Sequence, residues 1–151
     1  MWKSSKIFVF LAALFVSSGQ AKAQAIEWAN GVWEIDLNEL DEISPDAEEE
    51  QCDTNPEIIT VSGDQKTIRF DRKFPDPEDS STRIFITEIQ PQYLKIVCDR
   101  NAPNADCNEW DWYLYFYDSD RYVWVRDDWI DDAGNMTGHT VSRRRCPLPV
   151  A

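Results

Sequence analysis

The sequence predicts an all-β domain, built as a small antiparallel up-and-down barrel of about eight strands. Three observations indicate this fold: runs rich in β-branched and aromatic residues, turn signals between them, and a length of 151 residues that suits one domain. A β-sandwich is the alternative. The runs are residues 31–37, 57–62, 66–72, 82–89, 92–99, 111–117, 121–127 and 137–145.

Tight turns separate several of these runs. Gly63-Asp64-Gln65, Gln90-Pro91 and the segment 118–121 carry residues that favour turns, so we expect neighbouring strands to be antiparallel. A small sheet hides its edge strands best by closing on itself. A closed barrel of this size is either filled by its own side chains or holds one small ligand.

The N-terminus has the form of a cleavable export signal. Lys3 and Lys6 precede the apolar run 7–16, and Ala21-Lys22-Ala23 follows as an A-x-A cleavage site. The apolar run is short of the roughly 20 residues that cross a bilayer, so we expect no membrane span in the mature chain. We therefore predict a signal peptide over 1–23 and a periplasmic or secreted protein.

The mature chain is expected to form one domain. Residues 24–56 make an acidic N-terminal segment with the first strand, and residues 57–151 make the remainder of the β domain. Leu37, Leu40 and Ile43 recur at helical spacing, which predicts a short helix near 38–50. The formal net charge of −13 disfavours nucleic acid and favours cationic ligands or a basic protein surface.

The four cysteines of an exported chain predict two disulfides. Three pairings are possible, and we favour Cys98–Cys107 with Cys52–Cys146, because the first closes a polar loop and the second ties the barrel to its last strand. Zinc is disfavoured, since there is no C-x-x-C motif and the only histidine is His139. We expect no cofactor.

One hairpin can be laid out residue by residue. With Ser119-Asp120 as a two-residue turn, side chains alternate between two faces. Rings with polar groups are enriched at recognition surfaces, although cross-strand aromatic pairs also simply stabilise sheets. The expected core face carries Trp112, Leu114, Phe116, Val123 and Val125. The opposite face, a candidate binding surface, carries Tyr113, Tyr115, Tyr117, Tyr122, Trp124 and Arg126.

Two short motifs resemble the lipocalin family. Gly31-Val32-Trp33 resembles the G-x-W motif of the first lipocalin strand, and residues 117–122 resemble the D-Y-x-x-Y turn between the sixth and seventh strands. The resemblance implies a small lipocalin-like exported barrel in which an arginine of the last strand stacks on Trp33. The candidates are Arg143, Arg144 and Arg145. Departures are the missing tyrosine after Asp118 and the absence of a helix after Cys146.

Catalytic motifs are absent from the sequence. There is no G-x-S-x-G motif and no cysteine–histidine pair outside the predicted disulfides, so we expect a protein that is not an enzyme. The arginines of 143–145 are expected to pair with acids of the domain, or alternatively to contact an anion at the barrel mouth. A calcium site is a weaker candidate, on the oxygen ligands of Asp127, Asp128, Asp131, Asp132 and Asn135.

These observations favour an exported binding protein. A small-molecule carrier needs an open cavity lined by rings such as Trp33, Trp112 and Phe116, and its ligand would be small and apolar or cationic. A protein-binding barrel, of which a secreted protease-inhibitor-like module is one form, needs the aromatic face of the hairpin to be exposed. The third alternative is a calcium-binding or carboxylate-dependent enzyme.

Overall fold

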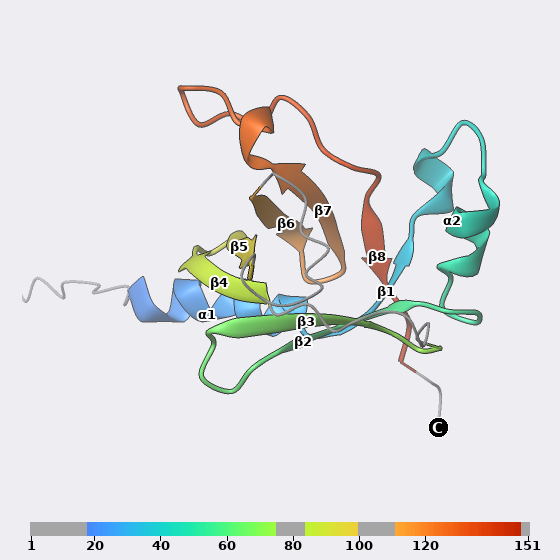
Figure 1. Ribbon diagram of the computed structural model, residues 1–151, viewed down its shortest axis with the longest axis horizontal. Helices are drawn as coiled ribbons and strands as arrows, with labels where there is room; N and C mark the ends of the chain where they lie inside the picture. The colour runs from blue at the N-terminus through green and yellow to red at the C-terminus, as the bar shows by residue number, and fades with distance from the viewer. Residues whose placement is uncertain (1–17, 75–83, 100–110, 149–151) are drawn as a thin grey trace, which may run out of the picture.

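In the computed structural model, which describes residues 18–74, 84–99 and 111–148, the strands form one closed antiparallel barrel (Figure 1). Each strand pairs with the next along the chain, and the last pairs with the first, so the predicted up-and-down barrel is confirmed. The strands are β1 (Gly31–Ile35), β2 (Glu57–Val61), β3 (Thr67–Arg72), β4 (Ile84–Ile89), β5 (Tyr93–Cys98), β6 (Trp112–Asp118), β7 (Arg121–Arg126) and β8 (Arg143–Arg145).

The last strand differs most from its prediction. A strand was expected over 137–145, but β8 begins at Arg143. The residues before it run beside β7 outside the ladder, with Thr140 N donating to the carbonyl oxygen of Trp124 at 2.9 Å. Gly138 lies against the ring of Trp129, at a site where an added Cβ would meet that ring at 3.4 Å. This stretch therefore packs on the barrel without extending its sheet.

Helix α1 (Ser18–Ala29) closes one end of the barrel. It contacts β2, β4, β5 and β6, and it buries Ala25, Ile26 and Ala29 against the interior. The predicted cleavage site after Ala23 falls within this helix, and most of the predicted signal, 1–17, lies outside the described residues. Within the described part of the chain, no helix combines the length and apolarity needed to cross a membrane.

The acidic segment forms two short helices where one was predicted. A 3-10 helix, η1, covers Leu37–Glu39, and α2 covers Pro45–Glu49. Ser44 separates them, because its hydroxyl accepts a hydrogen bond from Ala47 N and so caps a new helix. Pro45 occupies the first turn, where its missing N–H costs nothing. Helix α2 stands to one side of the barrel, near β1 and β8 (Figure 1).

The half of the interior nearest α1 is filled by large side chains. Trp33 of β1 packs edge-on against Tyr122 of β7, with ring centroids 4.8 Å apart, and its centroid lies 6.2 Å from that of Phe116 on β6. All three residues are fully buried. Leu94, Leu114 and Ile59 complete the same cluster. Trp33 and Phe116, two rings of the predicted cavity lining, therefore form a packed core.

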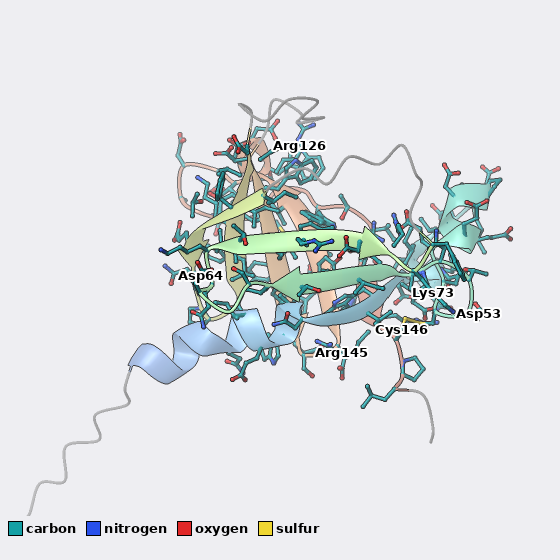
Figure 2. All side chains as sticks on the ribbon, turned by 60° about the horizontal axis from the view of Figure 1, so that its bottom comes forward. Asp53, Asp64, Lys73, Arg126, Arg145 and Cys146 are labelled. Atoms are coloured by element: carbon teal, nitrogen blue, oxygen red, sulfur yellow. A yellow bond between two sulfur atoms is a disulfide. The ribbon has the colours of Figure 1, made fainter. Side chains whose placement is uncertain are left out.

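Arg145 closes the barrel where β8 meets β1. Its guanidinium lies over the ring of Trp33, 4.3 Å from the centroid, which confirms the expected stack and selects one of the three candidate arginines. It also donates to the carbonyl oxygens of Asn30 at 2.9 Å and Ser119 at 2.8 Å. Figure 2 shows Arg145 at the end of the barrel where α1 leads into β1. One side chain thus joins β8, β1, α1 and the β6–β7 turn.

One predicted disulfide is confirmed. Cys52 and Cys146 are bonded, with their Cα atoms 5.6 Å apart and a sequence separation of 94 (Figure 2). Cys98 is also disulfide-bonded. Its predicted partner, Cys107, lies outside the described residues, so the Cys98–Cys107 pairing stays a prediction.

Replacing Gly31 should displace Arg145 from the Trp33 ring. Gly31 has φ +156°, and a Cβ there would collide with Nη1 of Arg145. We expect Gly31→Ala to lower the free energy of unfolding by about 1–3 kcal/mol in a denaturant titration. Gly63→Ala is the matched control, since no atom lies within 4 Å of its added Cβ. An equal loss of unfolding free energy in the two variants would contradict the stabilising role of the Arg145–Trp33 contact.

Candidate functional site

The six residues of the predicted aromatic face do not share one face. The turn pairing of Asp118 with Arg121 is as predicted, but the next pair is Phe116 with Tyr122. Tyr117 is the extra residue of a β-bulge, so the register beyond it shifts by one. Because side chains alternate with period two, this shift exchanges the two faces of β7.

The shift divides the predicted face between the inside and the outside of the barrel. Tyr122 and Trp124 belong to the interior, where Tyr122 packs against Phe116 with centroids 5.5 Å apart. Tyr113 and Tyr115 stay on the outer wall, where they pair with Val125 and Val123. Val123 and Val125 are therefore buried, as predicted, but they do not share the inward face of Leu114 and Phe116. Arg126 packs its guanidinium over the ring of Trp129, 4.6 Å from the centroid.

A polar network lies at the barrel mouth, the end opposite α1. We call it the mouth network. Two of its members lie on the inward face of their strands, because Glu57 is two residues from the buried Ile59 and Arg72 is in phase with Phe70 and the buried Ile68. Its members are Glu50, Glu57, Arg72, Tyr122 and Arg143.

One carboxylate of this network is held between two guanidiniums. Arg143 donates from Nη1 to Glu50 Oε2 at 2.8 Å, and Arg72 donates from Nη2 to Glu50 Oε1. Glu50 is the C-cap of α2, so its side chain reaches the mouth from outside the barrel wall. The second carboxylate, Glu57, accepts from the Tyr122 hydroxyl and lies 3.7 Å from Nε of Arg143.

Burial and charge set the ionisation of the network. Burial raises the pKa of Tyr122 well above its ordinary value and Glu57 raises it further, so the hydroxyl stays a donor. Burial by itself would raise the pKa of Glu50. The hydrogen bond from Arg72 and the charges of Arg143 and Arg72 outweigh burial, so the pKa of Glu50 lies below its usual value. Glu50 is therefore the anion of this site.

Two buried guanidinium nitrogens of the network have no hydrogen-bond partner among the described residues. They are Nη1 of Arg72 and Nε of Arg143. The 3.7 Å from Arg143 Nε to Glu57 Oε1 is too long for a hydrogen bond. A buried donor that lacks an acceptor costs about 1–3 kcal/mol of folding free energy. A ligand oxygen that accepts from either nitrogen would remove this cost.

Aromatic rings adjoin the network through Tyr122, whose centroid lies 6.3 Å from that of Trp124. Phe70 and Trp124 have centroids 4.9 Å apart, and Trp112 meets Trp124 edge-on at 5.9 Å. All three are only partly buried, in contrast to the packed rings near α1. The mouth half of the interior thus combines apolar ring surface with charged donors, the composition typical of small-molecule sites.

A hollow lies on the outer wall of the barrel, and we call it the tyrosine groove. Its volume is about 570 Å³. Tyr93 and Tyr113 meet edge-on with centroids 5.5 Å apart, and the loop after β7 borders the other side. The lining residues are Tyr93, Tyr113, Tyr115, Val125, Ile130, Gly134, Asn135 and Met136.

The structure does not assemble the predicted calcium ligands. Asp128 pairs with Arg126, and Asp131 accepts from the backbone and side-chain nitrogens of Asn135. Asp127 accepts from Asp128 N, and Asp132 is exposed. Their oxygens therefore close a turn rather than converge on a cation.

One cluster of potential metal ligands occurs among the described residues, formed by Glu34, Cys52 and Cys146. It does not suit a metal in the oxidised protein, because the two sulfur atoms are bonded to each other. The carboxylate of Glu34 already accepts from Cys52 N at 2.8 Å and from Nε of Arg144. His139 is exposed, with Nδ1 2.7 Å from the carbonyl oxygen of Thr140.

Comparison of the chain with models of protein families, with curated proteins and with solved structures found no match. The candidate site therefore rests on geometry. Sequence reasoning missed Glu50, Glu57 and Arg72. Strand alternation could have placed Glu57 and Arg72 inside, since each shares the phase of apolar neighbours. No pattern in the sequence predicts that Glu50, the C-cap of α2, lies at the barrel mouth.

Removing the Tyr122 hydroxyl should destabilise the mouth network. Tyr122→Phe keeps the ring but takes a donor from the buried Glu57 carboxylate. We expect the free energy of unfolding to fall by about 1–3 kcal/mol in a denaturant titration. Tyr117→Phe is the control, since Tyr117 is 42% exposed. A loss no larger than that of the control would show that the hydroxyl contributes nothing.

The depressed pKa of Glu50 predicts how stability depends on pH. A carboxyl whose pKa is lower in the folded state stabilises the fold above its unfolded pKa, and this contribution is lost as pH falls through the folded value. We expect Glu50→Gln to be less stable than the wild type near neutral pH. The difference should shrink below pH 4.5, the ordinary value. Thermal unfolding from pH 7 to 3, with exposed Glu48→Gln as control, measures it; a pH-independent difference would contradict the assignment.

Proposed function

We propose that the protein is an exported, non-enzymatic barrel that binds a small amphipathic molecule at its mouth. The apolar part of the ligand would contact the rings of Phe70, Trp112 and Trp124. Its anionic group, a carboxylate or similar anion, would lie between Arg72 and Arg143. The predicted export signal and the Cys52–Cys146 disulfide support a periplasmic or secreted carrier.

The position of Glu50 is the observation that carries this proposal. Its carboxylate already sits between the two guanidiniums, so the geometry suits a carboxylate. Glu50 belongs to a helix cap outside the sheet, and it can withdraw without breaking the ladder. When the ligand carboxylate replaces that of Glu50, the charge of the network stays the same. The acidic character of the whole chain therefore does not prevent binding of an anion at this position.

The unpartnered guanidinium nitrogens support the same site. A ligand that replaces Glu50 can also accept from Nη1 of Arg72 or Nε of Arg143, which have no acceptor within the part of the chain that the structure describes. These added hydrogen bonds would be present only in the complex. They favour the ligand over Glu50, which satisfies neither nitrogen.

Decanoate and 1-decanol share an apolar tail but differ in their head group, so a comparison of their affinities tests the contribution of the anionic group. We expect decanoate to bind the mature protein at least about tenfold more tightly than decanol, because a hydrogen bond to a charged group contributes about 1.5–3 kcal/mol. Calorimetry and tryptophan fluorescence, below the aggregation concentration of each probe, measure the two affinities. Equal affinities, or no binding of either probe, would remove the support for the proposal.

Two variants should change decanoate binding in opposite directions. Arg72→Met removes a donor and should weaken binding about tenfold or more. Glu50→Ala removes the competing carboxylate and should strengthen binding. Arg69→Met is the control, because Arg69 lies on the same strand with a side chain that is 67% exposed. Weaker binding in Glu50→Ala would mean that Glu50 does not occupy the ligand position.

A further inference from the structure

The tyrosine groove lies on the opposite side of the barrel wall from the mouth network and is not used by it. Tyr93, Tyr113 and Tyr115 project outward from β5 and β6, where Tyr93 pairs with Tyr115 and Lys95 with Tyr113. Val125, Ile130 and Met136 supply apolar surface. Tyrosine-rich hollows of this kind are typical of surfaces that recognise another molecule.

Cations of the chain itself already lie over two of the outward tyrosines. Lys95 Nζ is 5.4 Å from the centroid of Tyr113, and the guanidinium of Arg121 is 5.3 Å from that of Tyr117. Such contacts arise because the negative face of an aromatic ring attracts a cation. Among the described residues, no cation lies over Tyr93 or Tyr115. Both rings are half-buried, and they meet Tyr113 and Tyr117 edge-on at 5.5 Å and 5.7 Å.

A carboxylate stands at the edge of these tyrosine rings. Glu88 accepts from the Tyr93 hydroxyl at 2.8 Å and from Gln90 Nε2 at 3.0 Å. These hydrogen bonds hold its pKa below the usual value, so it is charged at neutral pH. Among the described residues, Lys95 is the basic group beside Glu88, its cross-strand partner, and its Nζ also lies 3.9 Å from a carboxylate oxygen of Asp111. The groove therefore combines tyrosine rings with a charged carboxylate at their edge.

We infer that the tyrosine groove docks a basic segment of a partner protein, with an arginine or lysine side chain over Tyr115 and beside Glu88. The net charge of −13 steers such a segment toward the barrel. Apolar residues next to the basic side chain would contact Ile130 and Met136, which are partly exposed. This docking role is separate from ligand binding at the mouth.

A short peptide with alternating arginine and leucine, capped at both ends, is the probe for this surface. Amide chemical shifts of the isotope-labelled mature protein should change at Tyr93, Tyr115 and Asn135. Tyr115→Ala and Glu88→Gln should each weaken binding by about threefold or more, the effect of losing one cation–π or ion contact. Glu88→Gln changes no shape, so it tests the surface even if Tyr115→Ala folds poorly.

Matched variants separate this surface from general attraction to an acidic protein. Phe74→Ala removes an aromatic side chain that is 65% exposed, and Glu48→Gln removes an exposed charge on α2. Both should leave peptide affinity unchanged. Equal weakening by Glu48→Gln, shift changes centred on α2, or equally tight binding of argininamide alone would each overturn the inference. Decanoate binding should be unchanged in Glu88→Gln. This result would show that the variant affects the tyrosine groove and not the mouth network.

Discussion

The contact between Trp33 and Arg145 is the interaction on which the rest of the barrel depends. The indole fills the closed half of the interior, and the guanidinium covers it while bonding to the chain at Asn30 and Ser119. This arrangement fixes the pairing of β1 with β8, which is the closing seam of the sheet. It also explains why Gly31 carries no side chain, since the arginine occupies that space.

The three arginines of β8 show how alternation distributes chemistry around this seam. Arg145 covers the core, Arg144 pairs outside with Glu34, and Arg143 enters the mouth network. The closed half of the interior is packed with aromatic rings. The two proposed surfaces therefore lie elsewhere, one at the mouth with the guanidiniums of Arg72 and Arg143, and one on the outer wall with its tyrosines.

The sequence predicts the strands far better than it predicts their register. Period-two alternation and turn residues locate all eight strands, because these signals are local. Alternation and turn residues do not predict the bulge at Tyr117. Its one extra residue places Tyr122 and Trp124 in the interior rather than on the predicted outer face. Glu50 reaches Arg143 across 93 positions of the chain, a contact that depends on the tertiary fold and on no local pattern.

The disulfide ties the C-terminal end of β8, one strand of the closing seam, to the segment between α2 and β2. Cys146 directly follows β8, and Cys52 precedes β2, with 94 positions between them. In an open chain, pairing β8 with β1 requires closure of a long loop, and such non-local pairing slows folding. Once the two cysteines are bonded, β8 is held near its partner and the search becomes local. Oxidation would therefore change the speed at which the barrel forms, as well as its resistance to unfolding.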